Sequence, residues 1–585
     1  MPVSFVKADS LLALDIGNVT TRATLFDVVD GRYRLIGSGE ASSTVNAPYH
    51  DLSEGVHRAV ERLQQITGRT LLDEEAKLIC PSRPDGSGVD LIATVISAGP
   101  PLKAVAVGLL AEVSLESAKS LLATTYAQVV EHLYLGDQRS LQDRLNLLLR
   151  AQPELIVVAG GTEGGAERAV LRMLEAVGLA SLLSGAESRP YILYVGNSAL
   201  RNQVESALGS LGTLTLSSNV RPTLEVEHLD SAKLDLMNVC RQIRSAKMPG
   251  FHEIDQLSSG GALPPSFGWE RIVRMLSKAY DHRKGVMGVD IGASATTLVI
   301  GLEGKTTVGV FPQYGLANPY LRNLEQVSLK DLSYWLTFDV SPEALRNTLL
   351  TKQIYPASLP MSEEELEIEL ALARIMLQNS LRELRKRFRH FGIGEPPILP
   401  PIEPILVAGS VLTRIPRWSQ AAMVLLDGLQ PSYITTLVLD QHHILAGLGV
   451  AAAANPVLAV QAMDFGTLLN LASVIAPVGK ARPGTVVLKA KLSYENGREE
   501  KLDFRYGALY RIPLSFGQTL QMHLQPLHGF DLGMGRAGIG GRVRLAGSAL
   551  GILIDLRGRP LPLIREPKRR QEWISRNVAA LEDHS

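Results

Sequence analysis

The sequence has very few cysteines and no excess of charge of either sign. Only two of its 585 residues are cysteines, Cys80 and Cys240, and they lie far apart. So few thiols exclude a disulfide scaffold and a cysteine-based zinc site, and they suit a reducing compartment. Lys and Arg number 59, as do Asp and Glu. The net charge therefore gives no reason to expect nucleic acid or an anionic membrane as a partner.

The sequence also lacks a stretch that reads as a signal peptide or a membrane span. The first ten residues contain no apolar run, and the apolar residues that follow include Asp15. The least polar long stretch, residues 444–463, is interrupted by Asn455 and Pro456, which predicts a buried helix and its end. We therefore expect a cytoplasmic protein, long enough for several domains.

An internal repeat organises the chain. Residues 11–26 align without gaps with residues 286–301, and each segment reads as an apolar strand, an Asp-Ile-Gly turn and a second strand. Residues 155–162 and 405–410 form a second pair, each an apolar strand that runs into a turn of small residues. The repeated order predicts two similar α/β halves that face each other, with chance repetition of a short motif as the alternative.

The residue pattern changes after about Pro456. Apolar and polar residues alternate over residues 486–494 and 501–506, with Asn496-Gly497 as a two-residue turn between them. This pattern predicts an antiparallel hairpin within a small β-rich domain. We therefore expect three domains: a first lobe with insertions, a second lobe with a returning helix, and a C-terminal β-rich domain, at residues 1–283, 284–455 and 456–585.

The first Asp-Ile-Gly hairpin has the residues of a phosphate-binding turn. A tight turn at Gly17 brings backbone N–H groups close to a ligand, and Thr20 and Thr21 add hydroxyl donors. Asp15, at the strand end, is suited to hold the waters of a bound Mg²⁺. The hairpin of the other half would clamp phosphates from the opposite side. The alternative is a plain hairpin whose aspartate caps its own turn.

These segments resemble the motifs of the actin-like ATPases, which include heat-shock chaperones and sugar kinases. Residues 15–17 look like the first phosphate motif, residues 290–292 like the second and residues 407–410 like the adenosine motif, in the same order. The resemblance implies a two-lobed actin-like (ribonuclease H-like) α/β fold that binds ATP and Mg²⁺, here with an added C-terminal β-rich domain. Asp15 would be catalytic, and Asp15 and Asp290 would lie at the metal. The implied binding residues are Asp15, Gly17, Asn18, Thr20, Thr21, Asp290, Gly292, Ser294, Thr296, Gly409 and Ser410.

A closer resemblance is to the MutL (GlmL) proteins that accompany coenzyme-B12-dependent glutamate mutase. It is carried by residues 155–165, 194–197, 218–222 and 550–561, of which the Gly-Gly-Thr-Glu-Gly-Gly run at 160–165 is the most specific. This resemblance implies an ATP-dependent accessory protein, a reactivating chaperone whose partners are the subunits of a B12-dependent mutase.

The second phosphate loop departs from the family's pattern. Ala293, Ser294 and Thr297 stand where the family has consecutive glycines and a later acid, and Asn18 stands where Ser or Thr is usual. Side chains at positions 293 and 294 would obstruct a phosphate. Three functions therefore stay open: a nucleotide-binding chaperone, a small-molecule kinase of the same fold, and a scaffold that binds no nucleotide.

Two further motifs do not support a cofactor site. Residues 533–538 match the dinucleotide pattern, but residues 542–545 read as a strand and not as the helix that the pattern needs. Asp440-Gln-His442 resembles the start of a cobalamin-binding signature, but Leu445 replaces the glycine expected next. We therefore expect His442 in a loop, and do not expect mutase chemistry from this chain.

Overall fold

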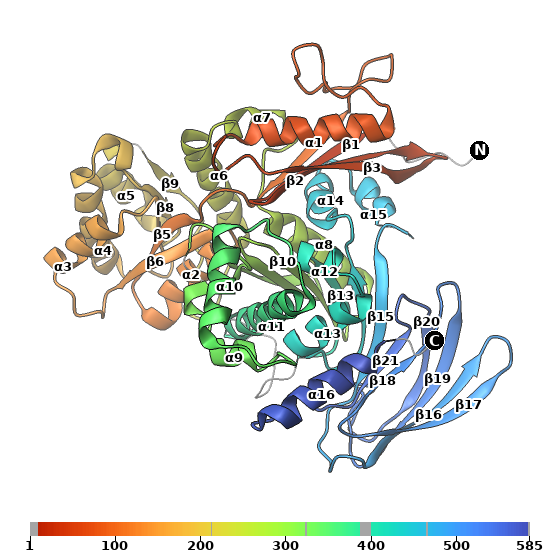
Figure 1. Ribbon diagram of the computed structural model, residues 1–585. Coiled ribbons are helices and arrows are strands. Elements are labelled where there is room, and N and C mark those ends of the chain that lie inside the picture. Colours follow the sequence, from red (N-terminus) through yellow and green to blue (C-terminus); the bar gives the residue numbers. More distant parts are fainter. Residues whose placement is uncertain (1–9, 212, 322–323, 387–398, 464–465, 583–585) are drawn as a thin grey trace.

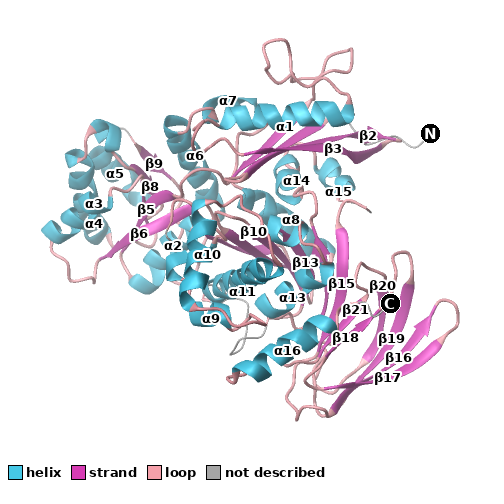
Figure 2. Ribbon diagram, viewed as in Figure 1, coloured by secondary structure: helices cyan, strands magenta, loops and turns pink. Residues whose placement is uncertain are grey.

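The computed structural model describes residues 10–211, 213–321, 324–386, 399–463 and 466–582. Residues 1–9, which include the start of the segment where a signal peptide would lie, are outside these ranges. Within them, no helix combines the length and the apolar character that crossing a membrane requires. Figure 2 shows helices packed around sheets through most of the molecule, and a strand-rich part at the lower right.

The first lobe is built on a four-stranded sheet of β1 (Leu11–Ile16), β2 (Thr20–Val29), β3 (Arg32–Ser42) and β4 (Leu91–Ile96). The strand order is β3-β2-β1-β4, with β1 antiparallel to β2 and parallel to β4. Leu12 and Leu14 share a core with helices α1 (Leu52–Thr67) and α7 (Phe251–Leu257), whereas Leu11 shares one with α8 (Pro265–Ala279). The continuous apolar pattern of β1 thus reflects burial on both faces.

A parallel sheet is inserted into the first lobe. Its strands are β5 (Leu102–Gly108), β6 (Ala127–Tyr134), β7 (Leu155–Val158), β8 (Tyr191–Tyr194) and β9 (Leu214–Leu216), in the order β6-β5-β7-β8-β9. This is the 2-1-3-4-5 order of a doubly wound sheet. One face is covered by α2 (Glu116–Leu122) and α6 (Asp230–Lys247), the other by α3 (Leu141–Ala151), α4 (Glu167–Leu183) and α5 (Arg201–Leu208). We call residues 102–247 the inserted domain; it projects at the left of Figure 1.

The expected correspondence between residues 155–162 and 405–410 is wrong. Residues 155–158 form β7 of the inserted domain, whereas the strand that lies parallel to β1 in the first lobe is β4. The pattern identified a strand buried on both faces, and every strand at the centre of a parallel sheet shares that pattern. It therefore could not show which sheet the strand joins.

The second lobe repeats the strand arrangement of the first. Its strands β10 (Gly285–Ile291), β11 (Thr296–Leu302), β12 (Lys305–Phe311) and β13 (Ile402–Ala408) follow the order β12-β11-β10-β13, with β10 parallel to β13. Asp15 lies opposite Arg22 in the first hairpin, and Asp290 lies opposite Thr297 in the second. The repeat confirms the expected fold of two similar α/β lobes in the actin-like arrangement.

Further elements complete the second lobe and return to the first. They are α9 (Leu329–Ser333), α10 (Pro342–Ile354), α11 (Glu363–Arg385), α12 (Ser410–Thr413), α13 (Trp418–Gly428), β14 (Tyr433–Leu439), α14 (Leu445–Ala451) and α15 (Pro456–Ala462). As expected, the apolar stretch 444–463 is helical and interrupted: Asn455 caps α15 through the Leu458 amide, and Pro456 is its first residue. Helix α14 shares a core with α8 of the first lobe.

The sheet of the second lobe continues into the C-terminal part of the chain. β15 (Leu469–Ala476), β21 (Ile552–Asp555) and β18 (Leu509–Ile512) follow β14, which makes eight strands. The strands before and after the expected boundary at residue 456 therefore belong to one sheet. The division of the chain into domains at residues 1–283, 284–455 and 456–585 stays a prediction.

A second C-terminal sheet packs over these added strands. It is antiparallel, with the order β17-β16-β19-β20, and consists of β16 (Val486–Tyr494), β17 (Glu499–Arg505), β19 (Thr519–Pro526) and β20 (Gly541–Ala546). The Asn496-Gly497 turn joins β16 to β17 as predicted, and the glycine-rich segment 533–538 is followed by strand β20 as predicted. Helix α16 (Pro567–Ala579) comes last.

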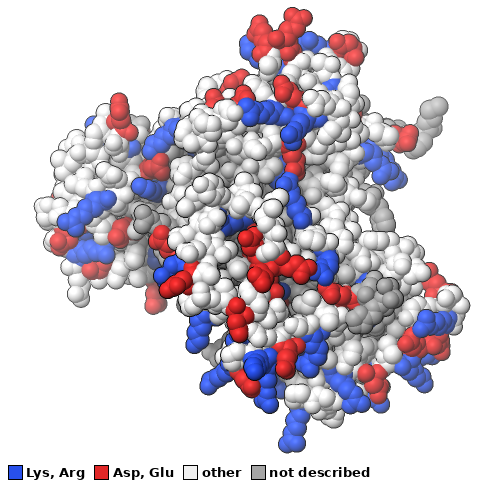
Figure 3. Space-filling view, viewed as in Figure 1, with Lys and Arg blue, Asp and Glu red and all other residues white. Residues whose placement is uncertain are grey.

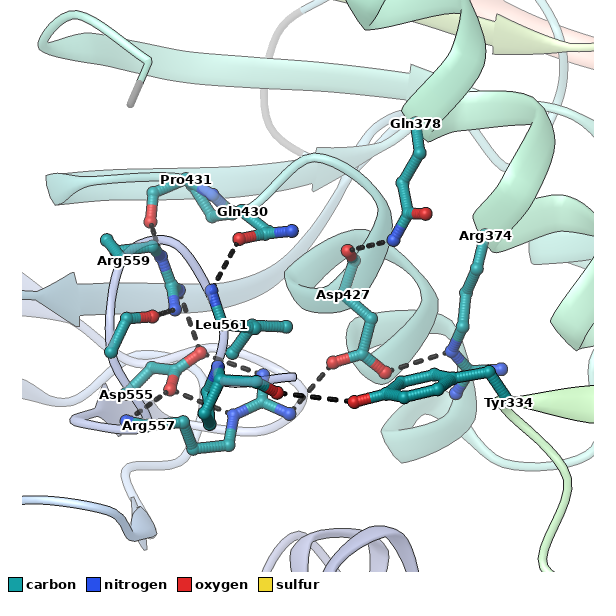
Figure 4. A network of polar contacts seen from close by, with 12 residues as sticks. Tyr334, Arg374, Gln378, Asp427, Gln430, Pro431, Asp555, Arg557, Arg559 and Leu561 are labelled. Atoms are coloured by element: carbon teal, nitrogen blue, oxygen red, sulfur yellow. Dashed lines mark hydrogen bonds and ion pairs between the residues drawn. The ribbon is translucent and has the colours of Figure 1, made fainter. Parts of the chain in front are cut away.

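Buried ion pairs attach the C-terminal segment to the second lobe (Figure 4). Asp427 of α13 accepts hydrogen bonds from Arg557 at 2.8 Å and from Arg374 of α11 at 2.9 Å. Asp555 accepts from Arg557 at 2.9 Å and from Arg559 at 2.8 Å. Burial alone would raise the pKa of Asp555, but Arg557 and Arg559 hold it well below its usual range. Removing one member would leave a buried charge without a partner.

Candidate functional site: the cleft between the lobes

A cavity of about 230 Å³ lies between the two lobes. Thr21 and Thr296, two of the predicted site residues, do not line it. Thr296 donates to the Tyr314 carbonyl at 2.7 Å, and Thr21 faces Gly55 of α1. The other predicted residues do line the cavity: Asp15, Gly17, Asn18, Thr20, Asp290, Gly292, Ser294, Gly409 and Ser410. Thr297 of the altered second loop lines it as well. The repeat thus brings both hairpin bends to one cleft.

The two hairpin bends have the same backbone geometry. The Gly17 amide donates to the Thr20 carbonyl at 3.0 Å, and the Gly292 amide donates to the Ala295 carbonyl at 3.0 Å. A Cβ atom at either glycine would lie 3.1 Å from the carbonyl oxygen that its own amide contacts. Each glycine therefore closes its own tight turn.

Gly409 has a different requirement. Its φ is +127°, and a Cβ atom there would lie 2.5 Å from the Ile291 carbonyl oxygen. Only glycine lets the end of β13 pass this close to the end of β10. The close approach places Ser410 beside the first-lobe hairpin, where its hydroxyl accepts a hydrogen bond from Arg22 at 3.1 Å.

Three carboxylates face the cleft: Asp440 is buried, and Asp15 and Asp290 are half-buried. Burial and the nearby charges of Asp15 and Asp440 raise the pKa of Asp290 to about 7. Burial also raises the pKa of Asp440 to about 6, against the hydrogen bonds that it accepts from the amides of the first turn of α14. These carboxylates repel one another, so the cleft favours a cation.

The same carboxylates do not form a ready-made metal site. Within the described ranges, no three His, Cys, Asp or Glu side chains lie close enough together to hold a metal ion. Asp440 was not among the predicted residues, although its place directly after the apolar run of β14 was visible in the sequence. As expected, His442 lies in the loop between β14 and α14.

Arg22 is the second site residue that the sequence reasoning missed. Its buried guanidinium contacts Asp15 at 3.3 Å and Glu40 at 2.7 Å, and it reaches Ser410 of the other lobe. Burial raises the pKa of Asp15, and Arg22 opposes that rise. Because Arg22 lies directly opposite Asp15 in the hairpin register, the repeat alignment contained the signal that would have found it.

The two hairpin loops touch each other across the cleft. Asn18 accepts a hydrogen bond from the Gly99 amide at 2.8 Å, and its own amide donates to the Ser294 hydroxyl. Asn318 then donates to the Ser294 carbonyl at 2.7 Å and to the Tyr126 hydroxyl at 3.0 Å. Asn18 and Ser294, which depart from the family's pattern, thus close the space between the two loops.

Comparison with known proteins gives one family match over most of the chain. A family model described as MutL protein matches residues 11–465. Protein MutL of Clostridium tetanomorphum is 22% identical over 406 residues, which cover 66% of this chain and 80% of that protein.

Several solved structures are similar at low identity. A nucleotide-free acetone carboxylase structure is 13% identical, covers 86% of this chain and 81% of its own, and has a TM-score of 0.32. An exopolyphosphatase from Cytophaga hutchinsonii is 10% identical, with coverages of 68% and 66% and a TM-score of 0.21. Because these TM-scores are low, the fold is assigned from the strand orders of the two lobes and not from these structures.

Proposed function

The chain belongs to the MutL family, and on that premise we propose that it is an ATP-binding accessory protein of a coenzyme-B12-dependent mutase. The observation that carries the proposal is the convergence of Asp15, Asp290 and Gly409, from the ends of equivalent and neighbouring strands, on one cleft between two lobes. A partner would be a mutase subunit, glutamate mutase or a relative, and the role would be that of a reactivating chaperone.

The residues of the cleft fit Mg²⁺ and a polyphosphate in their chemistry. Mg²⁺ prefers carboxylate and water oxygens and usually keeps several waters. Asp15 and Asp290 would hold it through such waters, which would relieve the repulsion that raises the pKa of Asp290. Bound ATP would supply the phosphoanhydride whose cleavage drives the cycle. Asp15, as the proposed catalytic residue, would orient a water toward it.

Arg22 would contribute the positive charge that phosphate oxygens need. Its guanidinium already contacts Asp15 and, across the cleft, Ser410. Arginine forms paired hydrogen bonds to phosphate as readily as to carboxylate. On entry of a nucleotide, the Arg22 guanidinium would exchange its contact with Asp15 for one with phosphate, and Asp15 would then be free to hold Mg²⁺ through its waters.

The protein would act on its partner through a change in the angle between the two lobes. The Asn18–Ser294 contact holds the loops together, so a ligand between them must separate the two side chains. A ligand shifts such an equilibrium by as much as its affinity differs between the open and closed forms. The nucleotide would in this way set the relative position of the lobes.

A second candidate function is a scaffold that binds no nucleotide. The Asn18–Ser294 contact favours it, because it occupies the space between the loops. So does the cavity, whose volume of about 230 Å³ is below the roughly 300–1,000 Å³ of most small-molecule sites. The third possible function, a small-molecule kinase, is disfavoured because this chain has Thr297 where the family has an acid.

One set of measurements separates these functions. Thermal unfolding with millimolar Mg-ATP and Mg-ADP reports binding, because stabilisation follows RT ln(1 + [L]/Kd). Phosphate release reports hydrolysis, and co-purification with glutamate mutase subunits, with and without ATP, reports the partner. We expect a thermal shift and a nucleotide-sensitive complex. No shift would support the scaffold, and no complex with any B12-dependent mutase would exclude the accessory role.

A further inference from the structure

The outer C-terminal sheet carries a row of basic side chains, one from each strand. Lys501 of β17 lies directly opposite Lys491 of β16, Lys491 lies opposite His523 of β19, and His523 lies opposite Arg542 of β20. The alternate residues of these strands, such as Leu492 and Met522, are buried in the core below. All four basic side chains therefore share the outer face. We call them the basic row.

Two lysines of the row face each other directly, and Glu499 lies near both. Like charges directly opposite each other on neighbouring strands destabilise a sheet. Lys491 has one partner, Glu499, at 2.8 Å. In the part of the chain that the structure describes, no carboxylate lies within 4.0 Å of Lys501, Arg542 or the adjacent Lys489, even though Asp503 stands opposite Lys489.

Protection of the sheet edges explains only part of the row. Charged side chains on edge strands prevent unwanted pairing with other chains, which accounts for Lys501 and Arg542 on the edge strands β17 and β20. Lys491 and His523 lie on the two central strands, where pairing is already complete. Polar side chains are ordinary at such outward positions of a sheet with one buried face, and together with the edge residues they give an anionic partner a continuous line of basic side chains.

We propose that the basic row is the docking surface for a carboxylate-rich surface of a protein partner. Neighbouring strands lie about 4.8 Å apart, so four strands carry the row over about 14 Å. Acidic side chains at positions i, i+4 and i+8 of a helix span about 12 Å. Figure 1 places this sheet at the lower right, at the edge of the molecule.

The same face argues against nucleic acid as the occupant. The acidic side chains of Glu499, Asp503 and Glu495 stand among the basic ones, and Figure 3 shows both signs over this part of the surface. A continuous phosphate backbone would meet these carboxylates, whereas a carboxylate-rich protein surface that also carries a few basic side chains can pair with both signs. If the partner is a mutase subunit, the inference rests on the proposed function.

The test compares charge reversal with charge conservation in the full-length chain. The variants are Lys491→Glu/Lys501→Glu, Lys491→Arg/Lys501→Arg, the single Arg542→Glu, and a control, Lys103→Glu/Lys305→Glu, at exposed strand lysines outside this sheet. Binding is measured to purified mutase subunits, to polyglutamate and to a DNA duplex. We expect the reversed pair to weaken mutase and polyglutamate binding by about tenfold or more, with Arg542→Glu acting in the same direction. The arginine pair and the control should bind as the unaltered protein does.

The outcomes separate this inference from the proposed function. If the unaltered protein binds mutase and the reversed pair binds it equally well, the docking surface is wrong while the function stands. If the mutase does not bind but polyglutamate binds through these lysines, the function is wrong while the surface stands. Binding of neither probe, or DNA binding that exceeds polyglutamate binding, overturns the docking surface. The reversed pair still places like charges opposite each other and removes the partner of Glu499, so its melting temperature should fall somewhat. Binding is therefore measured well below that temperature, and Arg542→Glu, which keeps the Lys491–Glu499 pair, serves as the second variant.

Discussion

Asn18 in the loop of the first hairpin donates a hydrogen bond to the hydroxyl of Ser294 in the loop of the second. The two side chains come from opposite lobes and are 276 residues apart in the sequence. Both stand where residues depart from the family's phosphate loops. This bond is therefore a contact between the lobes that opening of the cleft must break, and under the proposed function it would link the state of the cleft to nucleotide binding.

Shortening Ser294 should ease nucleotide binding. A hydrogen bond of this kind contributes about 1 kcal/mol, so Ser294→Gly should shift the lobes toward the open form and tighten Mg-ATP binding by up to about fivefold. Isothermal titration measures the change. Ser432→Gly is the control, because Ser432 is a buried serine of the same lobe that does not line the cavity. Unchanged or weaker binding by Ser294→Gly would show that the contact does not oppose the ligand.

The cleft should make stability fall as the pH rises. Asp290 has a pKa of about 7 in the folded protein, raised from 3.8 by burial and by Asp15 and Asp440. The folded state therefore holds more protons than the unfolded state between these two values, and stability is lost as the pH rises toward 7. Asp290→Asn removes this loss. Its free energy of unfolding, relative to that of the unaltered protein, should therefore rise by up to roughly 4 kcal/mol between pH 4 and pH 8.

Urea unfolding of both proteins across this pH range tests the charge on Asp290. Mg-ATP supplies a second readout, because a cation in the cleft offsets the ionised carboxylate. At pH 8 it should stabilise the unaltered protein more than Asp290→Asn. An advantage of the asparagine variant that does not vary with pH would mean that Asp290 is already ionised at low pH.

Removing Arg22 should leave the charge of Asp15 without its partner cation. Because Arg22 is buried and pairs with the half-buried Asp15 and with Glu40, Arg22→Met leaves both carboxylates without their cation, which should cost about 1–3 kcal/mol of unfolding free energy. Asp15→Asn in the same chain should recover a large part of the loss. A double-mutant cycle by urea unfolding measures the coupling. Additive effects of the two changes would show that the ion pair is not the cause.

The C-terminal segment should be needed for a stable second lobe. Arg557→Met should cost about 3–5 kcal/mol, because it leaves Asp427 and Asp555 with fewer buried partners. Arg569→Met is the matched control, since the Arg569 side chain is 77% exposed and pairs, within the described residues, with the exposed Glu566 alone. A chain ending at Met463 also loses β15, which pairs with β14. If that chain keeps full stability and binds Mg-ATP, the two lobes do not need the residues after Met463.

The sequence predicted the repeat because local rules determine it. The apolar strand, the glycine turn and the register of each hairpin depend on residues close together in the chain, so Asp15 and Asp290 were correctly placed as equivalents. The Asn496-Gly497 hairpin was predictable for the same reason.

Long-range pairing was not predictable in this way. The apolar segment 155–158 fits any buried parallel strand, and its place in the inserted domain depends on strands far along the chain. Arg22 lies within the expected first hairpin and Asp440 lies beside the expected loop at His442, yet their meeting in the cleft depends on how the lobes face each other. Equally, β15 reads as one more C-terminal strand, and only its pairing with β14 reveals that it belongs to the second lobe.

Calorimetric titration of Mg-ATP into the unaltered chain, Asp15→Asn and Thr297→Ala tests the central claim most directly. If the nucleotide lies between the lobes with the first hairpin dominant, the unaltered chain should bind Mg-ATP. Asp15→Asn should then weaken binding by about tenfold or more, as expected when a group beside a bound cation loses its charge. Thr297→Ala, which removes no charge, should change it far less. No heat of binding at millimolar Mg-ATP in the unaltered chain, or equal effects of the two substitutions, would contradict it.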